Sequence, residues 1–141
     1  MRSTVALGAA VSIAALVGAS VFTQAVGQAQ GPSTSFRTPT GNIGCLVSDG
    51  MAACEIYNYS YSAPVKPADC YGAWGDRITV ESGGTQFHCH GDRMVEATAP
   101  VLDYGSRASI GQFSCLSTVD YVECAGPGHS FRVARTFYTT S

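Results

Sequence analysis

Apolar and polar residues alternate along short segments of the chain, and a period of two is typical of β-strands with one buried face. Several of these segments occur in pairs separated by a short turn-like stretch, which predicts β-hairpins. The three pairs are 42–47 with 52–57, 77–81 with 86–90, and 110–116 with 121–125. The alternation continues through Tyr57, Tyr59 and Tyr61, so we expect the second strand of the first hairpin to extend that far.

The rest of the chain adds few further elements. A first short strand is expected near Phe36 and a last one between Phe131 and Tyr138, whereas 94–100 has no clear assignment and 100–109 has the composition of a loop. No segment after residue 29 shows the sustained apolar period of a helix. The sequence therefore predicts a mainly β fold with little helix, a small antiparallel sandwich or barrel built from disulfide-stapled hairpins.

Two of the hairpins share a sequence pattern built around paired cysteines, which indicates a small internal repeat. The two copies are Gly41-Asn-Ile-Gly-Cys45-Leu followed by Cys54, and Gly111-Gln-Phe-Ser-Cys115-Leu followed by Cys124. An even number of cysteines in an exported chain favours complete pairing. We predict the pairs Cys45–Cys54 from the hairpin register, Cys115–Cys124 by analogy with the first copy, and Cys70–Cys89 by elimination.

The turns of the two copies differ in sequence. In the first copy, Asp49-Gly50 suits a two-residue type I′ turn, whose central residues both need a positive φ. That turn pairs Ser48 with Met51 and so places the two cysteines of the copy opposite one another. In the second copy, Val119-Asp120 suits the same turn poorly because a β-branched residue resists a positive φ, and a longer loop is the alternative.

Residues 1–29 have the features of an export signal. Arg2 is their only charged residue, and 5–22 is an unbroken run of apolar and small residues followed by small residues at 25–29, where a peptidase would cut. The run is rich in Ala and Gly, so we expect cleavage and no permanent membrane anchor. We then expect a flexible tether at 30–35 and a single disulfide-stabilised β domain at 36–141, secreted or held in the cell envelope.

Charge and motifs argue against several functions. The formal net charge is −2 and Lys66 is the only lysine, so nucleic acid is not an expected partner. No Gly-x-Ser-x-Gly segment occurs, and His129 and Ser130 are adjacent, so on a strand their side chains would face opposite ways. We predict no catalytic residue, no enzyme activity and no cofactor.

The strongest alternative to this non-enzymatic interpretation is a metal site. His88 and His90 flank Cys89, and residues two apart on a strand share a face, so two imidazoles could bind Zn²⁺ or Cu²⁺ together with a third group such as Asp92, Glu96 or His129. Two ligands alone do not make a site, so we predict no bound metal. A metal-assisted hydrolase using His88 and His90 remains the alternative function.

Tyr57, Tyr59 and Tyr61 are the residues most suggestive of binding. If they are exposed, their rings could form a platform for an envelope protein or a glycan, and if they are buried they are part of the core. The predicted function is a non-enzymatic binding module. An enzyme inhibitor that presents the 61–69 loop, whose Pro64 and Pro67 end the strand, is a further alternative.

The chain resembles a family of small secreted actinobacterial, mycobacterial-type proteins of unknown function. The resemblance rests on Thr38-Pro-Thr-Gly41-Asn-Ile-Gly-Cys45, Cys54-Glu-Ile, Lys66-Pro-Ala-Asp-Cys70, Trp74-Gly, Phe87-His-Cys89, Asp103-Tyr104-Gly105-Ser, Gly111-Gln-Phe-Ser-Cys115, Cys124, Gly128-His-Ser-Phe131 and Arg135-Thr-Phe-Tyr138. Similar proteins tend to have Trp at the position of Tyr61, Pro at that of Asp103 and Gly at that of Tyr121. The resemblance implies an envelope or extracellular location and brings no known catalytic residue.

Overall fold

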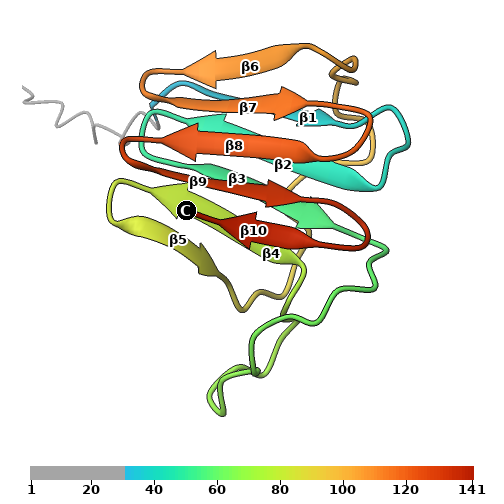
Figure 1. Ribbon diagram of the computed structural model, residues 1–141, viewed down its shortest axis with the longest axis vertical. Helices are drawn as coiled ribbons and strands as arrows, with labels where there is room; N and C mark the ends of the chain where they lie inside the picture. Colours follow the sequence, from blue (N-terminus) through green and yellow to red (C-terminus); the bar gives the residue numbers. More distant parts are fainter. Residues whose placement is uncertain (1–30) are drawn as a thin grey trace, which may run out of the picture.

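In the computed structural model, which describes residues 31–141, the predicted hairpins assemble into two five-stranded antiparallel sheets. The first sheet has the order β1 (Ser33–Arg37), β2 (Ile43–Ser48), β3 (Ala52–Ile56), β4 (Arg77–Glu81) and β5 (Gly84–Phe87). The second contains β6 (Arg107–Ile110), β7 (Phe113–Ser117), β8 (Val122–Gly126), β9 (His129–Val133) and β10 (Tyr138–Thr140). Each strand pairs with the next in sequence, so each sheet is a meander, and the two sheets lie face to face (Figure 1).

The predicted fold class is confirmed, and the architecture is a sandwich. Alternate residues of each strand point between the sheets, where burial of apolar side chains drives folding. The largest of these fully buried apolar side chains are Phe131, Ile56, Ile78, Val47, Val80, Val122 and Val133. No helix in the described part of the chain has the length and apolar character needed to cross a membrane.

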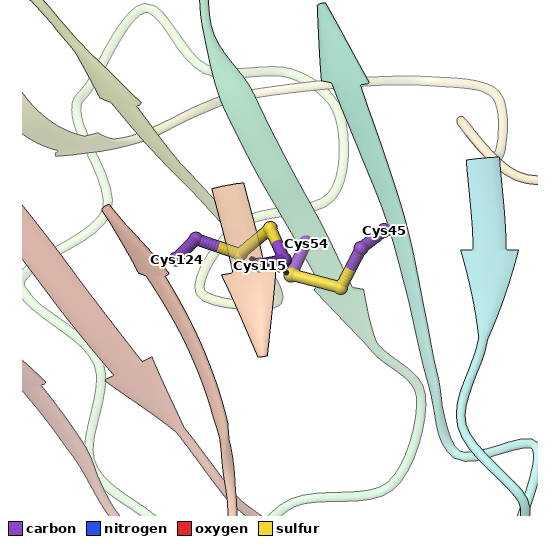
Figure 2. A group of neighbouring side chains, drawn as sticks. All are labelled: Cys45, Cys54, Cys115 and Cys124. Atoms are coloured by element: carbon purple, nitrogen blue, oxygen red, sulfur yellow. Dashed lines mark hydrogen bonds between the residues drawn. A yellow bond between two sulfur atoms is a disulfide. The ribbon is translucent and has the colours of Figure 1, made fainter. Parts of the chain in front are cut away.

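Two of the three disulfides lie at the centre of this core. Cys45–Cys54 joins β2 to β3 and Cys115–Cys124 joins β7 to β8, each between residues directly opposite in the ladder. Figure 2 shows the two bridges meeting between the sheets, with the sulfurs of Cys54 and Cys124 only 3.3 Å apart. With Cys70–Cys89, these are the three pairs that the sequence predicts.

The repeat is real, but the predicted type I′ turn is wrong. Neither Asp49 nor Gly50 has a positive φ. Instead, the hydroxyl of Ser48 accepts hydrogen bonds from the amides of Gly50 and Met51, at 3.3 and 3.2 Å. In the second copy, the hydroxyl of Thr118 likewise accepts hydrogen bonds from the backbone amides two and three residues later in the chain. Because this turn needs no positive φ, both copies adopt it, and the predicted register is kept.

Several strand boundaries differ from the prediction. The segment expected as one last strand between Phe131 and Tyr138 is divided between β9 and β10, which pair with each other. β1 begins at Ser33, within the expected tether, while the expected export segment, residues 1–29, lies outside the described residues. The segment expected as one strand at 110–116 is split between β6 and β7, because Gly111 adopts a φ of +56° and turns the chain. β6 also begins at Arg107, inside the segment expected to be a loop.

The tyrosine segment is not part of a strand. β3 ends at Ile56, so the expected extension through Tyr61 is wrong. β5 likewise ends at Phe87, before the two histidines that were expected to share a strand face. Both differences concern the long connections that follow β3 and β5, where the candidate site lies.

Candidate functional site

The connection between β3 and β4, residues 57–76, is the largest departure from a minimal sandwich, and we call it the projecting loop. Figure 1 shows it in green, extending well beyond the sheets. The corresponding connection of the second sheet, between β8 and β9, consists of Pro127 and Gly128 alone. Loops longer than about 12–15 residues without secondary structure are uncommon in small domains and are often functional.

Several bonds fix the shape of the projecting loop. The disulfide Cys70–Cys89 ties it to the segment that follows β5. Ala73 exchanges two backbone hydrogen bonds with His90, at 2.7 and 3.1 Å. Within the loop, the indole of Trp74 donates a hydrogen bond of 2.8 Å to the carbonyl of Pro64. These bonds join the two sides of the loop to each other and to the sandwich.

Tyr59 and Tyr61 brace the base of the loop. Their rings stack with centroids 4.3 Å apart, and Tyr61 meets Tyr138 of β10 edge-on at 5.1 Å. The hydroxyl of Tyr61 donates to the carbonyl of Gly75 at 2.7 Å. Both rings are half-buried against the core, so they are neither an open platform nor central core residues.

The environment of these two phenols favours their neutral forms. Burial raises the pKa of Tyr61 above its usual value, and the proximity of Tyr59 and Asp76 adds to the effect. Burial also raises the pKa of Tyr59, again with a contribution from the carboxylate of Asp76. Tyr57 has different neighbours, because the guanidinium of Arg93 lies 3.9 Å above its ring. The three tyrosines therefore do not act as one surface.

The tip of the projecting loop, residues 65–71, carries two exposed apolar side chains. Val65 is 92% exposed and Tyr71 is 95% exposed, although Cys70 beside it is buried. Single exposed apolar residues are common on protein surfaces and need no special explanation. Here two of them stand on a loop that a disulfide holds in place.

A buried ionic network lies behind the loop, on the outer face of the first sheet. Glu55 of β3 is only 1% exposed, and its Oε1 accepts hydrogen bonds from Nε and Nη2 of Arg77, its neighbour in β4. Its Oε2 accepts a hydrogen bond of 2.9 Å from the amide of Met94. Arg77 also donates to the carbonyl of Asp92 at 2.8 Å. A buried charge is tolerated only when it is paired and hydrogen-bonded in this way.

The network holds the connection 88–106 against the outer face of the first sheet. Val95 of this segment is buried and packs over Gly44, where an added Cβ would lie 3.0 Å from the Cβ of Val95. Sequence reasoning missed Glu55 as a buried residue. The available signal was an acid inside the otherwise apolar run Ala52-Ala-Cys-Glu-Ile56, while the segment that covers it lies far away in the sequence.

The two candidate metal ligands each have a hydrogen-bond partner. The Nε2 of His88 lies 2.7 Å from the hydroxyl of Thr79. The Nε2 of His90 lies 2.9 Å from both carboxylate oxygens of Asp76. Within residues 31–141, the one group of three or more potential metal ligands is the set of four core cysteines, whose sulfurs are bonded in disulfides. Asp76 and His90 join the base of the loop to the segment after β5.

The fold and the site together define a class of protein: a small all-β sandwich built on a repeated hairpin, held by three disulfides and carrying one long braced loop. Disulfides persist in oxidising surroundings, so this class fits an extracellular domain. The chain belongs to a family of unknown function, DUF6636, which it matches over residues 15–139. No curated protein and no solved structure is significantly similar to it.

Proposed function

We propose that the chain is an exported, non-enzymatic module that binds a protein partner through the tip of its projecting loop. The observation that carries this proposal is the combination of bracing and exposure in one segment. A disulfide and the Trp74–Pro64 hydrogen bond fix the loop, while Val65 and Tyr71 at its tip are almost fully exposed. An exported domain of the cell envelope or extracellular space is the setting that the disulfides and the expected signal at 1–29 favour.

The shape of the loop indicates the kind of partner. A tip that projects beyond the sheets (Figure 1) and carries two exposed apolar side chains suits a concave apolar cleft on another protein, as in inhibitors that insert a loop into an enzyme. Full burial of a residue such as Val65 contributes about 1.5–3 kcal/mol. A loop that is already fixed loses less conformational entropy on binding, which favours affinity.

Two other functions have less support from the geometry. A glycan platform made of the three tyrosines is not favoured, because Tyr59 and Tyr61 stack on each other and both hydroxyls donate to loop carbonyls. A metal-assisted hydrolase is not favoured either, because His88 and His90 are engaged by Thr79 and Asp76. The binding interpretation uses the groups that remain exposed.

The test uses the oxidised mature protein as bait for the envelope and secreted proteins of its own cells. A captured protein is purified, and its dissociation constant is measured for the wild type and for Tyr71→Ala, Val65→Ser and Val119→Ser. Val119 is an exposed apolar residue outside the loop and serves as the matched control. We expect Tyr71→Ala to weaken binding by at least 10-fold, as loss of an interface anchor does, and Val119→Ser to leave it unchanged.

The proposal fails if no protein binds the oxidised domain directly. It also fails if the dissociation constant of the captured protein is the same for the wild type and both loop variants, because the contact would then lie elsewhere on the molecule.

A further inference from the structure

A second candidate site lies at one end of the sandwich, apart from the tip of the projecting loop. Five connections meet there: 38–42, 57–58, 103–105, 118–121 and 134–135. They enclose an open groove of about 370 Å³. Small-molecule sites in proteins typically measure about 300–1,000 Å³, so this groove suits a ligand of modest size.

The lining of the groove mixes polar and apolar residues and is balanced in charge. The polar part of the lining includes Thr40, Asn58, Tyr104 and Tyr121, and the apolar part includes Ile43, Val122 and Ala134. One acid, Asp120, and one base, Arg135, also line it. A site for phosphate or another strong anion would gather several cations, and a lipid site would be mainly apolar. The mixed and charge-balanced lining therefore favours a neutral ligand that carries both hydroxyl groups and an apolar face.

Part of the wall is fixed and part is free to bind. The side-chain Nδ2 of Asn42 donates a hydrogen bond of 3.0 Å to the backbone carbonyl of Asn58, and the side-chain Oδ1 of Asn42 accepts one of 2.8 Å from the backbone amide of Asn58. These two bonds hold the connections 38–42 and 57–58 together. The guanidinium of Arg132 lies 4.5 Å from the ring of Tyr121 and orients it. The hydroxyls of Tyr104 and Tyr121 and the guanidinium of Arg135 have no hydrogen-bond partner among residues 31–141.

We propose that this groove binds a neutral carbohydrate of one to three sugar units. A sugar presents hydroxyls that both donate and accept, and a phenol and an amide can satisfy both roles. Its apolar C–H face packs well on an aromatic ring, which Tyr104 and Tyr121 supply. The inference does not depend on the tip of the projecting loop or on the protein partner proposed for it.

The experiment exposes the oxidised mature protein to an array of neutral oligosaccharides built from hexose and pentose units, and measures each positive by titration calorimetry. The variants are Tyr104→Ala, Arg135→Gln and, as the matched control, Tyr71→Ala in the projecting loop. We expect one or more neutral sugars to bind, with at least 10-fold weaker binding in Tyr104→Ala and no change in Tyr71→Ala. If Tyr104→Ala does not fold, Tyr104→Phe removes only the hydroxyl and is expected to weaken binding severalfold.

Three results would overturn the inference: no neutral oligosaccharide binds, the groove variants bind as well as the wild type, or only anionic glycans or peptides bind. A loss of sugar binding in Tyr71→Ala with none in Tyr104→Ala would place the sugar on the loop and contradict the groove. Protein capture through Tyr71 is measured separately, so either proposal can fail while the other stands.

Discussion

The two halves of the sandwich share a hairpin and a buried disulfide but differ in what joins their strands. β7 to β9 follow one another through short turns, whereas β3 and β4 are separated by the projecting loop. The first half also holds the third disulfide and the Glu55 network. The second half forms its sheet without any of these features. The additions of the first half are therefore not needed to build this kind of sheet, and the binding role that we propose for the projecting loop would explain them.

The same contrast holds for ion pairs on the outer faces of the sheets. Glu55 and Arg77 are opposite one another on β3 and β4, and Glu123 and Arg132 are opposite on β8 and β9. Side-chain exposure is 1% and 18% in the first pair but 26% and 47% in the second. A buried pair leaves an uncompensated charge when one partner is removed, while an exposed pair contributes little.

The largest predicted effect follows from this difference. Glu55→Ala should lower the free energy of unfolding by about 3–5 kcal/mol, because the Arg77 guanidinium and the Met94 amide lose their acceptor. Glu123→Ala should cost less than about 1 kcal/mol. Denaturant unfolding of the oxidised proteins measures both. Equal losses would show that the network does not distinguish the two halves.

The next effect concerns the base of the projecting loop. Tyr59→Ala should cost about 1–3 kcal/mol, because a half-buried ring loses its stacking on Tyr61 and part of its burial. Denaturant unfolding of the oxidised Tyr59→Ala protein measures this loss. A loss near zero would mean that the ring is a free surface, and a loss near 5 kcal/mol would make it a central core residue.

A pH-dependent effect should come from Tyr61. Burial raises its folded-state pKa above the usual 10.0, so its neutral form stabilises the fold below about pH 10, and this contribution is lost as the pH rises towards the folded-state pKa. We expect the unfolding free energy to fall above about pH 10, and to fall less in Tyr61→Phe. Tyr71→Phe, at an exposed site, is the control and should follow the wild type. Identical pH profiles for all three proteins would contradict the assignment.

The smallest effect on stability is expected at the tip. Tyr71→Ala should change the free energy of unfolding by less than about 0.5 kcal/mol, since the side chain is 95% exposed. Denaturant unfolding of Tyr71→Ala and Tyr59→Ala under the same conditions compares the stability loss at the tip of the loop with the loss at its base. A loss above 1 kcal/mol at Tyr71 would show that the residue supports the fold and is not held ready for a partner.

The sequence was most informative where local patterns decide the structure. Period-two alternation and the spacing of Cys45 and Cys54 give the hairpin, its register and its disulfide. The turn type was missed because Asp49-Gly50 fits two different turns, and the hydroxyl of Ser48 selects the one without a positive φ. Alternation at Tyr59 and Tyr61 resembles a strand, although here it serves packing at the base of a loop.

The candidate sites depended on contacts that no local pattern encodes. Glu55 is buried by the segment around Met94 and Val95, which joins it only in the folded chain. The groove likewise forms where five distant connections meet. The 61–69 loop was recognisable from Pro64 and Pro67, but its projection beyond the sheets and its bracing were not.

The central claim is that the projecting loop of the first half is a rigid element, and backbone ¹⁵N relaxation of the oxidised domain tests it most directly. We predict order parameters near 0.85 for residues 65–71, similar to those of the strands, and a marked fall at the same residues when Cys70 and Cys89 are both replaced by Ala. Order parameters below about 0.6 at the tip of the oxidised wild type would show a flexible loop, and would contradict the account.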